Sequence, residues 1–110
     1  MDNIIQILIS KDFSPTPGPR RKSEGDFSGQ LFREGSLEPA FIEALKDNKK
    51  IVINLDGTLG YGTSFLEEVF GGLQRKYPKI NVLEYIDLIS KEEPYLIDDI
   101  NQYVKEANQQ

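Results

Sequence analysis

The chain has 110 residues, of which 38% are apolar, and a formal net charge of −5 at pH 7. Its length is typical of one domain with one core, so we expect a single domain over residues 1–110. The acidic balance disfavours nonspecific binding to nucleic acid or to an anionic membrane, because both need a basic face. No apolar run reaches the roughly 18 residues of a membrane-spanning helix. We therefore expect neither nucleic acid nor a membrane as a partner.

The chain contains no cysteine and no histidine. This excludes disulfides, thiolate metal sites and thiol nucleophiles. It also removes the commonest general base at neutral pH and the commonest transition-metal ligand. Because paired-carboxylate and phosphate-loop motifs are also missing, we expect no catalytic residues, no metal ligands, no cofactor and no enzymatic activity. The first residues favour a strand over a signal peptide, and together with the composition and the absence of cysteine this predicts a cytoplasmic location.

Three apolar runs predict strands, and amphipathic stretches between them predict helices. The runs are IIQILI (4–9), KIVINL (50–55) and INVLEYIDLI (80–89). The central run is apolar on both faces, which is typical of a strand covered on both sides. An extended segment near residues 20–23 would return along the first strand. We therefore expect an α/β fold with a small, mixed but mostly parallel sheet of about four strands and helices packed on it.

The region after Ser28, which is a good N-cap residue, predicts the first helix. Pro39 falls inside the apolar helical stripe and leaves two alternatives. One kinked helix could run from about residue 29 to 48, or a short helix could end at Gly35 and a second could start after Ser36. We favour the second alternative, because Pro39 would then lie in a first turn, where proline is tolerated.

A second helix is predicted to begin at Ser64, after the central strand. Gly71 and Gly72 lie inside its apolar stripe, where each costs roughly 1 kcal/mol relative to alanine. Close approach of this helix to the sheet or to a partner would explain both glycines, and we favour the sheet. A capping box formed by Ser90 and Glu93 predicts the start of the last helix.

The turn GYGTSF places two hydroxyls, Thr63 and Ser64, where the central strand ends and the second helix begins. One interpretation is a helix cap, worth about 1 kcal/mol. The other is a phosphoacceptor, because a phosphate there would meet the positive end of the helix and add about two negative charges to a docking surface. The neighbouring glutamates could equally be a solvated helix face. The partner-binding residues on that surface would be Tyr61, Gly62, Phe65, Glu67 and Glu68.

The run IVINLDGTLGYGTSFLEEVFGGL resembles the signature of STAS domains, the fold of bacterial anti-anti-sigma factors. Together, SGQLFRE and TSFLEEVFGGL are more similar to the STAS-like domain family of uncharacterised function, over nearly the whole chain from Pro17. The resemblance implies a bacterial regulatory module without enzymatic activity. It implies a protein partner, either an ATPase-fold kinase or an anti-sigma-like protein. It also implies phosphorylation at the start of the helix, on Thr63 when counted from the strand and on Ser64 when counted back from the Phe-Leu pair.

The basic loop before the first helix leaves a second function open, a ligand-sensing domain that binds a nucleotide or another phosphate anion through residues 17–33. Free amides at the helix start would face the anion, and neighbouring arginines would close around it. A solvated loop is the simpler alternative. The anion-binding residues would be Arg20, Arg21, Ser28, Gly29 and Arg33.

Overall fold

Three parallel strands form the sheet, in the spatial order β1-β2-β3. They are β1 (Ile4–Leu8), β2 (Lys50–Asn54) and β3 (Ile86–Ile89). The coordinates are a computed structural model, and the structure describes residues 3–109. Ile7 pairs with Ile53, and Ile53 pairs with Leu88, so one apolar row crosses all three strands. The predicted α/β class and the parallel arrangement are confirmed.

The predicted number of strands is wrong, because the described part of the chain has three strands and all of them are parallel. The segment expected to return along β1 instead forms a short 3₁₀ turn at Lys22–Glu24. The backbone of this region is hydrogen-bonded to the start of a helix instead of to a strand. The carbonyls of Pro19 and Arg20 accept hydrogen bonds from the amides of Gly29 and Gln30, at 2.8 and 2.9 Å. A segment held against a helix start in this way cannot pair with a strand.

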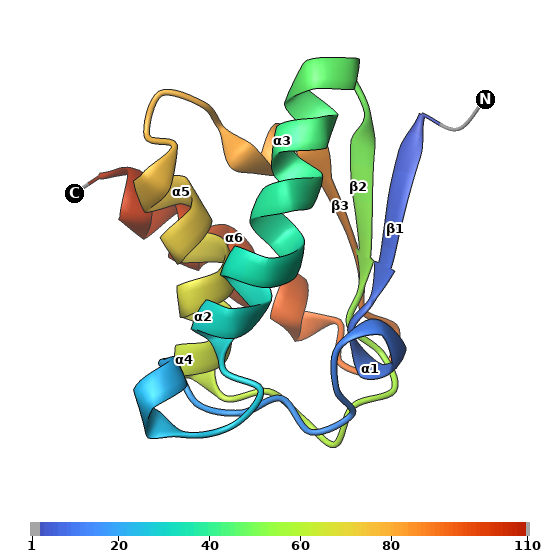
Figure 1. Ribbon diagram of the computed structural model, residues 1–110, viewed down its shortest axis with the longest axis vertical. Coiled ribbons are helices and arrows are strands. Elements are labelled where there is room, and N and C mark those ends of the chain that lie inside the picture. The colour runs from blue at the N-terminus through green and yellow to red at the C-terminus, as the bar shows by residue number, and fades with distance from the viewer. Residues whose placement is uncertain (1–2, 110) are drawn as a thin grey trace.

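The helical segments 29–47, 63–76 and 95–108 all lie on one side of the sheet (Figure 1). In a parallel sheet with consecutive strand order, crossovers of the same hand place their helices on the same face. The prediction that the central strand is covered on both faces is therefore wrong. Val52 and Asn54 are half-buried on its other face, where they line a shallow hollow together with Gln6.

The third strand is shorter than the predicted segment 80–89, because its first half is a 3₁₀ turn at Val82–Tyr85. The cause is the side chain of Gln74, which is fully buried. Its amide nitrogen donates to the carbonyl of Ile80 at 2.7 Å, and its oxygen accepts from the amide of Val82 at 3.2 Å. These bonds hold residues 80–82 beside a helix, so only the last four residues reach the sheet.

One continuous helix follows the basic loop, built from α2 (Gly29–Phe32), a π-helical turn (Arg33–Leu37) and α3 (Glu38–Asp47). The favoured alternative, a break at Gly35, is wrong, and the single helix is correct. The amide of Glu38 reaches back five residues to the carbonyl of Arg33. Because of this wide turn, the helix passes Pro39, which has no amide to donate, without ending. We call it helix α2–α3.

Both ends of helix α2–α3 follow from single side chains. The Ser28 hydroxyl accepts a hydrogen bond from the amide of Leu31 at 3.0 Å, so the predicted N-cap is confirmed. At the other end Asn48 adopts a left-handed conformation, with φ of 55°, which stops the helix.

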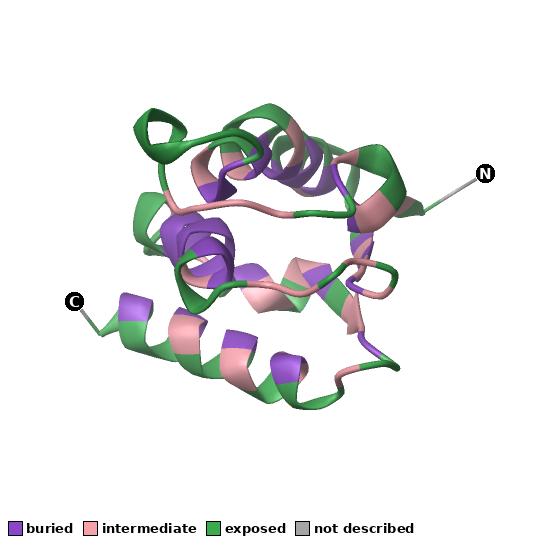
Figure 2. Ribbon diagram, turned by 90° about the horizontal axis from the view of Figure 1, so that it is seen from below, coloured by how far each residue is buried: buried purple, intermediate pink, exposed green. Residues whose placement is uncertain are grey.

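A second continuous helix consists of α4 (Thr63–Leu66), a π-helical turn (Glu67–Gly71) and α5 (Gly72–Lys76). We call it helix α4–α5. It lies between helix α2–α3 and α6 (Tyr95–Asn108), and most of its ribbon is buried (Figure 2). A helix that is buried nearly all round is typical of the interior of a helical layer.

The remaining helices are α1 (Ile9–Asp12) and α6. The predicted capping box at the start of α6 is wrong. The Ser90 hydroxyl donates to the carbonyl of Glu93 at 2.7 Å, and Pro94 occupies the N-cap position. Ser90 therefore stabilises the turn before α6 and does not bond to the amides in the first turn of α6.

An aromatic cluster joins the N-terminal segment to the two long helices. The ring of Phe13 lies 5.1 Å from that of Phe32 and 6.2 Å from that of Phe65, measured between centroids. Such pairs contribute about 0.5–1.5 kcal/mol each beyond the burial of their area. Because Phe65 points into this cluster, the residues just before it in helix α4–α5 are turned towards solvent.

Gly29 is predicted to be essential for the contact between helix α2–α3 and helix α4–α5. A Cβ atom there would lie 2.7 Å from the carbonyl oxygen of Phe65. We expect Gly29→Ala to lower the free energy of unfolding by about 1–3 kcal/mol, measured by urea denaturation. The matched control is Gly35→Ala in the same helix, where an added Cβ meets nothing within 4 Å. It should raise stability by up to about 1 kcal/mol. A Gly29→Ala protein as stable as the wild type would contradict the prediction.

Candidate functional site

Thr63 and Ser64 form the first turn of helix α4–α5, and both are exposed. The N-cap residue is Gly62, which has no side chain to cap the helix. Within residues 3–109, no hydrogen bond engages either hydroxyl. The helix-cap interpretation is therefore wrong. The two hydroxyls are exposed to solvent at the positive end of a long helix.

The loop before this helix presents an apolar side chain at its tip. Leu59 is 88% exposed, the largest exposure of any large hydrophobic side chain described. The base of the loop is fixed, because the Asp56 carboxylate accepts hydrogen bonds from the amides of Lys91 and Glu92 at 3.2 and 2.9 Å. Gly60 takes φ of 137°, a conformation open to glycine. The tip is thus held in place while its leucine projects into solvent.

Tyr61, a predicted partner-binding residue, fastens the loop to the core. Its hydroxyl donates to the carbonyl of Leu55 at 2.7 Å, and its ring lies 5.8 Å from that of Phe65. Burial raises the pKa of Tyr61 to about 12. Phe65 itself is fully buried, so its predicted contact with a partner is wrong. Gly62, by contrast, is exposed, and its contact with a partner stays a prediction.

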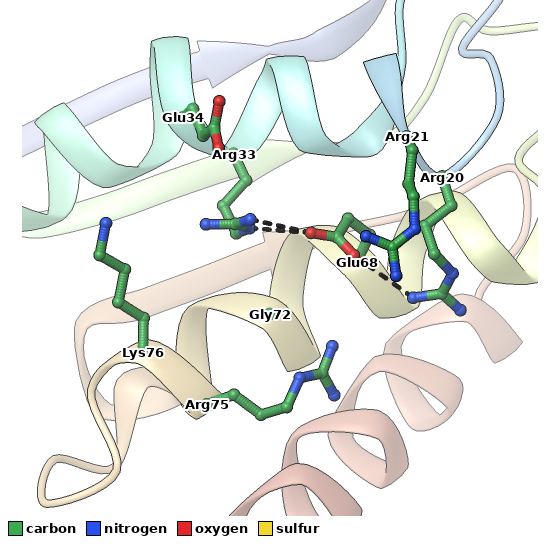
Figure 3. Close-up of a pocket in the computed structure, with 8 residues that line it drawn as sticks. All are labelled: Arg20, Arg21, Arg33, Glu34, Glu68, Gly72, Arg75 and Lys76. Atoms are coloured by element: carbon green, nitrogen blue, oxygen red, sulfur yellow. Dashed lines mark hydrogen bonds and ion pairs between the residues drawn. The ribbon is translucent and has the colours of Figure 1, made fainter. Parts of the chain in front are cut away.

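The side chain of Glu68 lies at the centre of an ion-pair network (Figure 3). It is 12% exposed, and Arg33 contacts it at 2.9 Å and Arg20 at 3.4 Å. Glu67 accepts from both terminal nitrogens of Arg75, at 2.6 and 3.0 Å, and pairs with Arg20 at 2.6 Å. Both glutamates were predicted as partner contacts or as a solvated face. The solvated-face interpretation is wrong, because both carboxylates pair with arginines within the chain, and their contact with a partner stays a prediction.

The network is a single series of alternating charges, with four cations and three carboxylates. Its contacts run between 2.6 and 3.4 Å. The basic loop, helix α2–α3 and helix α4–α5 all contribute, so the series holds these three segments together. In order, its members are Lys76, Glu38, Arg33, Glu68, Arg20, Glu67 and Arg75.

An open groove of about 770 Å³ lies over this network. Arg21, from the basic loop, reaches into it beside Glu68 and forms no ion pair with any described residue (Figure 3). The residues that line the groove are Arg20, Arg21, Arg33, Glu34, Glu68, Gly72, Arg75 and Lys76.

The part of the predicted anion site formed by Ser28 and Gly29, at the start of helix α2–α3, is wrong. Ser28 is fully buried, and its hydroxyl is used by the cap. The amide of Gly29 is taken by Pro19, as described above. Arg20, Arg21 and Arg33 do come together, but around a carboxylate of the neighbouring helix. Sequence reasoning missed Arg75 and Lys76, and the one available signal was the spacing of Glu67 and Arg75 along one predicted helix.

The paired glycines face the network, so the prediction that they pack on the sheet is wrong. A Cβ atom on Gly72 would lie 2.8 Å from Nε of Arg33. A Cβ atom on Gly71 would meet the carboxylate of Glu67. The glycines therefore make room for the ionic side chains that cross the helix at this point.

Two further findings bear on the class of site. Across the described residues, no group of three or more acidic side chains could hold a metal ion. No helix within residues 3–109 combines the length and the hydropathy needed to cross a bilayer.

The comparison with protein families identifies the fold family. A family model described as a STAS-like domain of unknown function (DUF4325) matches residues 28–96. The chain belongs to this STAS-like family. No curated protein and no solved structure matches it. The matched part of the STAS-like domain runs from the N-cap of helix α2–α3 into α6, so it contains the exposed hydroxyls and most of the network but not Arg20 or Arg21.

The network makes the stability of the STAS-like domain depend on pH. Hydrogen bonds from Arg75 and then Arg20 keep the pKa of Glu67 below its ordinary value of 4.5. A lowered pKa means that the pairing stabilises the fold above pH 4.5 and is lost as the pH falls through the folded-state pKa. We expect Glu67→Gln to be less stable than the wild type by about 1 kcal/mol at neutral pH.

This difference should shrink in urea unfolding experiments as the pH is lowered from 4.5 to about 3. The control is Glu106→Gln, which changes an exposed glutamate of α6 and should leave stability unchanged at every pH. A deficit in Glu67→Gln that stays constant down to the lowest pH would contradict the role of the charge.

Proposed function

We propose that this STAS-like domain is a non-enzymatic regulatory module that binds another protein through its helix-start surface, and that phosphorylation of Thr63 or Ser64 releases the partner. We define the helix-start surface as Leu59, Gly60, Gly62, Thr63 and Ser64. The proposal depends on one observation. Two exposed hydroxyls without hydrogen bonds begin a helix whose middle part, residues 65–74, is mostly buried.

The position suits a modification that changes binding and leaves the fold intact. Neither hydroxyl makes a hydrogen bond that a phosphate would break. The positive end of the helix dipole and the free amides of the first turn stabilise a nearby negative charge by about 0.3–1 kcal/mol. The effect of the phosphate is therefore directed outwards, to whatever touches the surface.

Leu59 supports the idea that this surface docks a protein. Burying a leucine side chain contributes roughly 1.5–3 kcal/mol. A leucine that is 88% exposed on a loop with a fixed base offers this energy without a large ordering cost. A phosphate placed beside such an apolar contact has to lose water when the partner binds. It therefore opposes docking.

The proposed partner is an ATPase-fold protein kinase or an anti-sigma-like protein, and the proposed compartment is the bacterial cytoplasm. The partner and the bacterial origin follow from the similarity to STAS domains, whereas the cytoplasmic location rests on the composition of the sequence. The family match supports that similarity and leaves the partner to experiment.

The test measures binding to a partner that is captured from the native host with the unphosphorylated domain and then purified. We expect Ser64→Asp or Thr63→Asp, and separately Leu59→Ala, to weaken binding at least about tenfold, which corresponds to about 1.4 kcal/mol. Far-UV circular dichroism should stay unchanged in each variant. The intact mass of the domain isolated from the host should include one added phosphate, lost in the Thr63→Ala, Ser64→Ala double variant.

The matched control is Ser23→Asp, which adds the same charge at an exposed serine of the basic loop. It should bind the partner like the wild type. If Ser23→Asp weakens binding as much as Ser64→Asp, or if no variant of the helix-start surface changes binding, the proposal is wrong.

A further inference from the structure

The groove over Glu68 carries more positive charge than its carboxylates neutralise. The alternating series has four cations and three carboxylates, which leaves one positive charge in excess. Arg21 adds a second, because it forms no ion pair with the described residues. Glu34 on the rim does not cancel this excess, since Lys22, which lies outside the groove, pairs with it at 2.5 Å.

The ion pairs also leave donors unused. Arg20 contacts its two carboxylates through Nη1 alone, so its Nε and Nη2 have no acceptor among residues 3–109. The guanidinium groups of Arg20, Arg21 and Arg75 converge on the space around Glu68 (Figure 3). Charge-assisted bonds from arginine are roughly twice as strong as neutral ones, and their planar fork suits a phosphate.

The floor of the groove is held in place before any ligand arrives. Arg33 is 13% exposed and is fixed between Glu38 and Glu68, against the space that Gly72 leaves. Each oxygen of Glu68 already faces an arginine, so its charge is compensated. A site whose side chains are ordered in advance loses less affinity to ordering on binding.

We propose that this groove binds the phosphate group of a small phosphomonoester in its dianionic form. Two excess positive charges match two negative charges. The residues that line the groove are all charged except Gly72, so no aromatic or large apolar side chain is present to stack on a nucleobase. The phosphate is therefore recognised and the base is not. The site shares no residue with the helix-start surface, so experiments can support or contradict it independently of the proposed function.

The test is an NMR titration of the whole chain with inorganic phosphate at constant ionic strength, maintained with chloride. We expect saturable shifts in the amides of residues 20–21, 33–34 and 72–76. Binding should weaken about tenfold when the pH is lowered from about 8 to about 5, because the anion takes up its second proton in this range. Adenosine and cytidine monophosphates should bind within about twofold of each other, since only the phosphate is held.

Arg21→Gln should weaken binding about tenfold, the effect of one charge-assisted contact. It should fold normally, because Arg21 forms no ion pair, and its melting temperature checks this. The control is Lys11→Gln, which removes one positive charge at an exposed lysine of α1 and should bind phosphate like the wild type. No saturable shift, equal losses in the two variants, or strong preference for one base would each overturn the proposal.

Discussion

The pairing of Arg33 with Glu68 determines how the two long helices meet. A carboxylate that is 12% exposed is costly to bury unless cations surround it, and here arginines come from helix α2–α3 and from the basic loop. Both helices contain a π-helical turn at this place, and the two turns contact each other. Widened turns shift the direction of side chains relative to a regular helix and are frequent at functional sites. The network and the two turns are thus one structural feature.

Helix α4–α5 connects the two surfaces to which we assign functions. Its first turn carries the exposed hydroxyls, and its next turns carry Glu67, Glu68 and the glycines beneath the groove. Phe65 locks this helix into the aromatic cluster from the other side. With one side held by aromatic packing and another by ion pairs, the helix cannot rotate, and its start is presented to solvent in a fixed orientation.

Local patterns predicted the elements that depend on local chemistry. The apolar runs identified the strands, the Ser28 hydroxyl identified a helix start, and the motif around Thr63 identified the STAS-like family. The errors arose where contacts between residues far apart in the sequence determine the structure. Gln74 shortens the third strand through hydrogen bonds, and the pairs of Arg20 with Glu67 and Arg33 with Glu68 span 47 and 35 residues. A single sequence shows the arginines and the glutamates but not which of them pair. The arginines were therefore predicted in an anion site and the glutamates on a partner-binding surface.

The most direct test is a double-mutant cycle on Arg33 and Glu68, followed by urea unfolding. Arg33→Met and Glu68→Met should each lower the free energy of unfolding by about 3 kcal/mol, because each leaves a buried charge without its main partner. The double variant should lose less than the sum by about 1–3 kcal/mol, since Glu38 keeps Lys76 and Arg20 keeps Glu67. Losses that add to within about 0.5 kcal/mol would show that the two side chains are not coupled, and would contradict the account.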